Sequence, residues 1–192
     1  MEAGLAQVEN PILDTLKPHL SRSVDDERPV VLMMCGIAGA GKTTLAKAVV
    51  ENLPQFSRLS IDEIIFSKHG LYGVDYPADA QLLQQYQDEA DEIYHMTFKT
   101  LLSEKRDIVL DRAFYAKDDR LDFKKMIEEG GGRRVLVYLK AADKETLWTR
   151  IVERSTKEKN ANSALDISRE ILEMYWEGFE APVEEGEIVF NI

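Results

Sequence analysis

One glycine-rich segment, Gly36–Thr43, constrains this chain more than any other part of the sequence. It reads Gly-Ile-Ala-Gly-Ala-Gly-Lys-Thr, which matches the G-x-x-x-x-G-K-[ST] pattern of a phosphate-binding loop. An apolar run typical of a buried strand, residues 29–35, comes before it, and residues 44–53 carry apolar side chains at helical spacing. Because strand, loop and helix follow in the order that the pattern requires, we predict a loop that holds phosphate groups.

The residue types in the loop explain how it would bind an anion. Glycines allow positive φ angles and let the backbone approach a ligand closely. Successive N–H groups and the positive end of the following helix then favour a phosphate. Lys42 would place a charge at the β- and γ-phosphates, and the Thr43 hydroxyl is an oxygen ligand of the kind that Mg²⁺ prefers. The expected nucleotide contacts are Gly36, Ile37, Ala38, Gly39, Ala40, Gly41, Lys42, Thr43 and Thr44.

Composition narrows the class of protein further. The 192 residues, 44% hydrophobic and 31% charged, fit a soluble globular protein with one main domain. The single cysteine, Cys35, excludes an intrachain disulfide and suits a reducing compartment. Since the chain also has no membrane-length apolar run and no signal-peptide core, we expect a cytoplasmic protein. The net charge of −11 argues against broad nucleic-acid binding, but not against a nucleotide in a local basic pocket.

Strand and helix patterns alternate along the chain, which predicts a mostly parallel sheet with helices on both faces. An amphipathic helix at 3–20 and a polar linker form a separate segment, residues 1–28, and the main domain spans 29–192. The expected strands are 30–35, 57–61, 107–110, 134–139 and 187–192. The expected helices of the main domain are 44–53, 79–104, 117–129, 143–156 and 166–178.

Two carboxylates stand where predicted strands end, at Asp62 and Asp111. Ligands of parallel sheets bind at this edge, and Ile108-Val109-Leu110-Asp111 has the Walker-B pattern of an apolar strand followed by a metal-binding Asp. A strand-end Asp can instead cap the next helix. For Asp111 we favour the metal, because a phosphate-binding loop is already present. For Asp62 the residues alone leave capping and proton transfer equally open.

Several segments in this order and spacing resemble the small P-loop kinases of the zeta-toxin-like, AAA_33-type group. Chloramphenicol phosphotransferase, gluconate kinase and the kinase domain of polynucleotide kinase are relatives, and the resemblance covers roughly residues 30–192. The segments that carry it are the phosphate-binding loop, Leu59–Glu63, Asp107–Tyr115, Arg120, Phe179–Pro182 and Glu184–Gly186. The resemblance implies a three-layer α/β P-loop NTPase fold. Its parallel sheet has five strands in the order 2-3-1-4-5, and a helical lid covers residues 150–170.

The resemblance also implies roles for residues. It assigns Mg-ATP as the phosphate donor, with ATP favoured over GTP, and makes Asp62 the group that activates an acceptor hydroxyl. Asp111 would hold Mg²⁺ together with Thr43, with Asp62 able to reach the ion through water. Arginines of the lid, Arg150 and Arg154, lie one helical turn apart and would stabilise charge on the phosphoryl group, with Arg150 also close to the nucleotide.

Some of these side chains could instead have purely structural roles. The lid arginines could form an ordinary solvated face that pairs with Glu153 or Glu158, and Arg169 is a weaker lid candidate. Residues 66–77 are loop-like and depart from the simple family pattern. Their aromatics could line an acceptor pocket or anchor the loop, and Arg120 could instead pair with Asp118 or Asp122. The acceptor candidates are Phe66, Tyr72, Arg112, Tyr115 and Arg120.

The remaining conspicuous side chains have structural interpretations. We expect His69 at the surface, Cys35 as a small buried residue, and Trp148 and Trp176 as packing residues. The sequence therefore favours an ATP- and Mg²⁺-dependent kinase that phosphorylates a hydroxyl of a small molecule. The alternatives are a nucleotide-dependent regulator or slow ATPase without an acceptor, and a toxin-like kinase acting on a nucleotide sugar or a nucleic-acid end. The sequence specifies neither the acceptor nor the oligomeric state.

Overall fold

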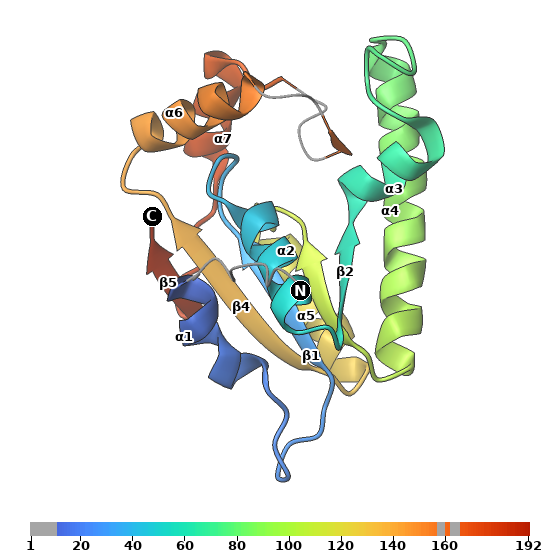
Figure 1. The fold of residues 1–192 in the computed structure, drawn as a ribbon, viewed down its shortest axis with the longest axis vertical. Coiled ribbons are helices and arrows are strands. Elements are labelled where there is room, and N and C mark those ends of the chain that lie inside the picture. Colours follow the sequence, from blue (N-terminus) through green and yellow to red (C-terminus); the bar gives the residue numbers. More distant parts are fainter. Residues whose placement is uncertain (1–10, 157–159, 162–165) are drawn as a thin grey trace, which may run out of the picture.

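The computed structural model describes residues 11–156, 160–161 and 166–192. They form a parallel sheet between two layers of helices (Figure 1). The strand order is β2-β3-β1-β4-β5, and every pairing is parallel, which confirms the predicted fold class and order. The strands are β1 Val30–Cys35, β2 Phe56–Ser60, β3 Asp107–Asp111, β4 Arg133–Lys140 and β5 Glu187–Asn191. The helices are α1 Pro11–Leu20, α2 Lys42–Asn52, α3 Ile61–His69, α4 Ala80–Ser103, α5 Lys117–Glu129, α6 Lys144–Ser155 and α7 Arg169–Gly178.

The alternation of side chains along the strands divides the core in two. Every residue of β1 is buried, and successive residues point to opposite faces of the sheet. Val30, Leu32 and Met34 pack in one cluster with α1 and α2, whereas Val31, Met33 and Cys35 pack in the other with α4 and α5. A central strand that is apolar throughout is expected for a parallel sheet covered on both faces.

Local capping fixes the starts of three helices. Asp79, Asp143 and Ser168 precede α4, α6 and α7, and each side chain accepts a hydrogen bond from a backbone N–H in the first turn. For α7 the bond runs from the Ile171 N–H to Ser168 Oγ, at 3.3 Å. The five helices predicted for the main domain lie within three residues of their predicted bounds, because apolar periodicity is a local signal.

The interpretation of residues 66–77 as a loop is partly wrong. Residues 61–69 form α3, so Phe66 and His69 lie on a helix that follows β2 directly. The helix ends at Gly70, where φ is +82°. The remaining residues, 71–79, connect α3 to α4.

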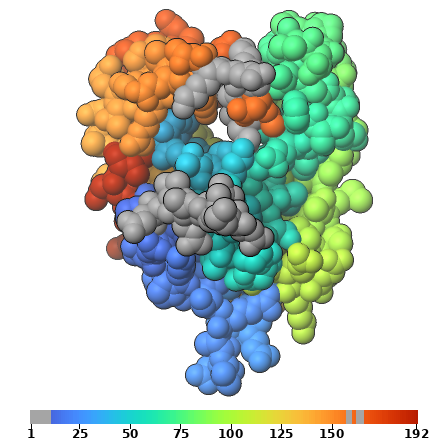
Figure 2. Space-filling view, in the orientation of Figure 1, coloured from blue at the N-terminus to red at the C-terminus, as the bar shows by residue number. Residues whose placement is uncertain are grey.

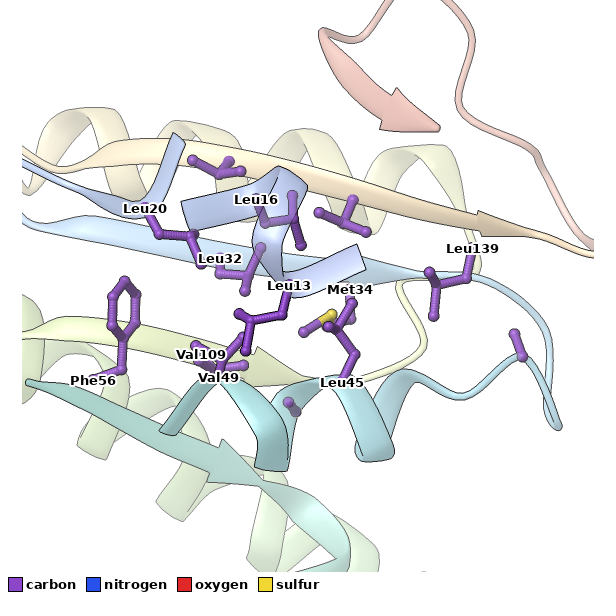
Figure 3. Packing of buried hydrophobic residues seen from close by; sticks show 14 of the residues in the cluster. Leu13, Leu16, Leu20, Leu32, Met34, Leu45, Val49, Phe56, Val109 and Leu139 are labelled. Atoms are coloured by element: carbon purple, nitrogen blue, oxygen red, sulfur yellow. The ribbon is translucent and has the colours of Figure 1, made fainter. Parts of the chain in front are cut away.

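The N-terminal helix packs on the same core as the sheet. Leu13, Leu16 and Leu20 are at most 2% exposed and lie against α2 and β1 (Figure 3). Residues 3–10 of the predicted helix lie outside the described residues. The segment assigned to 1–28 therefore contributes apolar contacts to the domain that follows it.

Two helical pairs rise above the carboxyl ends of the strands. The pair α6–α7 stands on one side of the phosphate-binding loop and the pair α3–α4 on the other (Figure 1). Figure 2 shows a hollow between them. Within the described ranges, no helix is both long enough and apolar enough to cross a membrane.

The packing of α1 can be tested with one substitution. Leu16 is fully buried, so Leu16→Ala should lower the free energy of unfolding of the whole domain by about 2–5 kcal/mol. The matched control is Lys17→Ala on the same helix, whose exposed pair with Asp14 should contribute less than about 1 kcal/mol. Urea unfolding measures both. Equal, small effects would show that α1 does not stabilise the domain.

Candidate active site

The phosphate-binding loop connects β1 to α2 and requires glycine at two tight positions. Gly36 and Gly39 have φ angles of +147° and +84°. A Cβ at Gly36 would lie 2.8 Å from the Leu139 carbonyl oxygen, and one at Gly39 would lie 2.9 Å from that of Leu147. The loop therefore packs directly on β4 and α6, which leaves no room for a side chain at either position.

Lys42 is the first residue of α2 and bends back over the loop. Its Nζ donates hydrogen bonds to the carbonyl oxygens of Gly36 and Ile37, at 2.8 and 3.0 Å. Loss of hydration lowers the pKa of Lys42 to about 8, and the charge of Asp111 opposes that shift. The ammonium group is thus held on the loop with few neighbours that neutralise it, which suits it to a phosphate.

Asp111, the last residue of β3, joins the loop helix to β2. Its Oδ1 accepts a hydrogen bond from Thr43 Oγ1 at 3.2 Å. Its Oδ2 accepts two from Arg58, from Nε at 2.9 Å and from Nη2 at 2.6 Å. Asp111 is not a helix cap, since the residue before α5 is Ala116. The capping alternative for Asp111 is therefore excluded.

Arg58 was not among the predicted site residues. The Arg58 and Asp111 side chains are 7% and 4% exposed, and Arg58 also pairs with Glu63. One signal could have found it. A charged side chain inside a short strand next to the Walker-B strand needs a partner, and Arg58 lies diagonally across from Asp111, which faces Ser60.

Asp62 lies in the first turn of α3, just beyond β2. It does not cap the helix, because the N-cap position belongs to Ser60. Desolvation and then the charge of Asp111 raise the pKa of Asp62, while the charges of Arg58, Arg154 and Lys42 oppose that rise. The site thus brings carboxylates from two neighbouring strand ends close enough to repel each other, beside the lysine of the loop.

The donor set of the loop fits a magnesium ion. Mg²⁺ binds oxygen ligands, often through one or two protein groups with phosphates and water completing its shell. The Thr43 hydroxyl and the Asp111 carboxylate are such a pair. Elsewhere in the described part of the chain, no group of three or more His, Cys, Asp or Glu side chains could hold a metal ion.

The lid arginines come from α6. Arg150 is exposed and Arg154 is half-buried, and neither has a hydrogen bond or ion pair with the part of the chain that the structure describes. Glu153 is therefore not their partner, and Glu158 lies outside the described residues. The charge of Arg154 lowers the pKa values of both Lys42 and Asp62, so this arginine lies close to both groups.

Arg169 has a different position from the other lid candidates. It pairs with Glu145, and its guanidinium lies 5.4 Å from the ring of Trp148. These contacts join α7 to α6. Residues 157–159 and 162–165 of the predicted lid lie outside the described residues.

Rings at the end of α3 and in the segment after it pack on α4 or on one another. His69 stacks on Tyr86 at 3.5 Å and hydrogen-bonds Glu89 at 2.9 Å. Tyr76 is 8% exposed and contacts Tyr72 edge-on at 5.8 Å. These contacts are what anchoring would give, and the acceptor role of Tyr72 stays a prediction.

Two of the predicted acceptor residues make specific polar contacts. The Arg112 guanidinium pairs with Asp91 at 2.9 Å and with Asp119 at 3.3 Å. The Tyr115 hydroxyl donates to the backbone carbonyl of Tyr175 in α7 at 2.8 Å. A third candidate, the Phe66 side chain, is 44% exposed.

Arg120 corrects the sequence interpretation. Its side chain is fully buried and forms a bidentate pair with Glu185, at 2.8 and 2.7 Å. It therefore pairs with neither Asp118 nor Asp122, and it presents no surface to an acceptor. The pairing was missed because 65 residues separate the partners.

Cys35 and Trp176 lie beside the loop. Cys35 is buried, and desolvation raises the pKa of its thiol to about 11, so it stays protonated and is no nucleophile. Trp176 lines a cavity of about 150 Å³ together with Ile37 and Phe179.

These features define a P-loop nucleotide-binding α/β protein. Residues 31–182 match the family AAA_33, described as an AAA domain. The chain belongs to the AAA_33 family. None of the curated proteins matches it.

Solved structures share the fold at low sequence identity. A candidate kinase from Chloroflexus aurantiacus is 19% identical with a TM-score of 0.67, over 86% of this chain and 88% of that one. A gluconokinase from Sinorhizobium meliloti is 16% identical with a TM-score of 0.51, over 86% and 82%. Kti12 of Chaetomium thermophilum, solved with ADP-AlF3, is 14% identical with a TM-score of 0.54, over 84% and 88%.

The lowered pKa of Lys42 predicts proton uptake when nucleotide binds. A pKa near 8 leaves the free amine about one-tenth deprotonated at pH 7 and about nine-tenths at pH 9, and a bound triphosphate restores its charge. Calorimetry with excess Mg²⁺, in buffers of different ionisation enthalpy, should show uptake rising over this range. Lys47→Ala, an exposed control in α2, should keep the rise. Proton uptake that does not change with pH would contradict the lowered pKa of Lys42.

Proposed function

We propose that this protein is a kinase that transfers the γ-phosphoryl group of ATP to a hydroxyl of a small molecule, with Mg²⁺. The observation that carries this proposal is the position of Asp62. It is a carboxylate that caps no helix, and it lies beside the phosphate-binding loop within reach of the charges of Lys42 and Arg154. Hydrolysis alone needs an oriented water, whereas transfer to an alcohol needs a base for the acceptor.

The donor half of the site is built by the loop. The backbone N–H groups of residues 36–44 and the Lys42 ammonium would hold the phosphates. Thr43 and Asp111 would hold the magnesium ion, which neutralises charge on the β- and γ-phosphates when it is bound. The glycines at 36 and 39 let this backbone pack against β4 and α6.

The acceptor half begins at Asp62. Its carboxylate would orient the acceptor hydroxyl and take its proton as the bond to phosphorus forms. Because the pKa of Asp62 is raised, the carboxylate is a stronger base than an ordinary aspartate. As the pH falls through that raised pKa, Asp62 gains a proton and the transfer rate should fall. Phe66 and Arg112 remain candidates for contact with the acceptor.

The lid would complete the site. Arg154 is close to Lys42 and Asp62, so it would stabilise charge on the phosphoryl group during transfer. Arg150 lies one turn earlier on the same helix and would contact the nucleotide. We further propose ATP over GTP, a small-molecule acceptor over nucleic acid given the net charge of −11, and a cytoplasmic location.

The proposal is tested by ATP turnover with and without hydroxyl compounds. Sugars, aminocyclitols, nucleosides and nucleotide sugars form a suitable panel, and the product is identified by mass spectrometry. A phosphorylated product supports the kinase. Slow turnover that no acceptor stimulates would instead support the nucleotide-dependent regulator.

Asp62→Asn separates transfer from nucleotide binding. The amide keeps the shape of the side chain but cannot take the proton, so transfer should fall by about 10²–10⁴-fold while the Kd for ATP changes little. The control Asp118→Asn, an exposed aspartate in the first turn of α5, should leave both unchanged. Full transfer activity in Asp62→Asn would refute the assignment of Asp62 as the general base.

The two lid arginines should differ in steady-state kinetics. Arg154→Gln removes a charge near the transferring group and should lower kcat by about 10²–10³-fold, the scale of one lost transition-state donor. Arg150→Gln should mainly raise the KM for ATP. The reverse pattern would exchange the two assignments, and no effect from either would leave the lid without a role in transfer.

A further inference from the structure

Arg58 lies between the donor and acceptor halves of the site. It stands in β2 opposite Val109 of β3, and Asp111 follows two residues later on the same face of the sheet. Its guanidinium thereby reaches Asp111 on one side and Glu63 of α3 on the other. The α2 helix, which carries Thr43, covers this face (Figure 1).

Arg58 uses most of the capacity of Asp111 to accept bonds. A carboxylate has about four acceptor positions. Two N–H groups of Arg58 bond to Oδ2, and the Thr43 hydroxyl bonds to Oδ1. About one position therefore remains for a metal ion or for a water that it binds.

Arg58 also neutralises the carboxylate. The Nη2 atom lies 2.6 Å from Oδ2, and both side chains are almost entirely removed from solvent. Charges that are shielded from water interact more strongly than exposed ones. A divalent cation that approaches the Thr43 side of Asp111 thus meets a carboxylate that already carries a cation.

We propose that Arg58 is an internal cation that competes with Mg²⁺ for Asp111 and so sets the Mg²⁺ concentration at which nucleotide binds. The inference rests on the proposed magnesium-nucleotide site. Glu63 is a second anionic partner of the guanidinium, because it already forms an ion pair with Arg58. The Glu63 side chain is 45% exposed. A cation on Asp111 shifts the guanidinium toward Glu63, which lies next to Asp62.

The test is the Mg²⁺ dependence of nucleotide binding. In Arg58→Gln, the half-maximal Mg²⁺ concentration for binding a fluorescent ATP analogue should fall by about three- to tenfold, because the competing charge is gone. In Glu63→Gln it should rise, because the charge of Arg58 is then less neutralised. Without nucleotide, the Tm of Arg58→Gln should fall, since Asp111 is left buried without its cation, and added Mg²⁺ should raise that Tm more than it raises the wild-type value.

Two further variants keep the inference falsifiable. Arg58→Lys retains the positive charge but loses the planar guanidinium. Its half-maximal Mg²⁺ concentration should stay within about twofold of the wild-type value, well below a tenfold change. Arg106→Gln is the matched control, because Arg106 donates to Ser57 at the far end of the same strand pair. The proposed competition is refuted if the half-maximal Mg²⁺ concentration is unchanged or raised in Arg58→Gln. It is also refuted if that concentration is lowered in Arg58→Lys. Wild-type binding without any Mg²⁺ dependence would instead refute the proposed metal site.

Discussion

The parallel register of β2, β3 and β1 is the constraint on which the site depends. Ser60 pairs with Asp111, and Leu110 pairs with Met33, so three strands reach their carboxyl ends together. This register sets Asp111 beside the loop helix and starts α3 at the same edge. A shift of one residue would turn Asp111 and Arg58 to the other face, among the apolar residues of α4 and α5. The buried pair of Arg58 and Asp111 thus also penalises a wrong register.

Charge at this edge is balanced although the whole chain is strongly acidic. Lys42, Arg58 and Arg154 face Asp62, Asp111 and Glu63, three cations against three anions. A triphosphate adds negative charge that these cations alone do not offset, which is the role that Mg²⁺ has in such sites. The local balance explains how a protein with a net charge of −11 can hold an anionic ligand.

Local signals predicted most of the fold, and long-range pairing accounts for what the sequence did not show. Periodicity located the strands and most helices, and the glycine pattern located the loop between β1 and α2. Residues 61–69 were missed as a helix because α3 follows β2 without a turn residue between them. Arg58 and the Arg120–Glu185 pair depend on which strands and segments become neighbours, which neither periodicity nor spacing encodes. The roles of the site residues remain predictions.

Arg120 and Glu185 show why a resemblance can identify segments without identifying ligands. Both belong to the segments that resemble the family, yet they bind each other in the interior. Their pair fixes α5 to the segment before β5, and Arg120 also donates to the Phe114 carbonyl in the loop after β3. Arg134 adds a hydrogen bond to the Glu185 carbonyl. Glu180 accepts from the first backbone N–H of α5, and Tyr115 bonds to the end of α7. The segment that follows Asp111 is therefore tied both to the last turn of α7 and to the segment between α7 and β5.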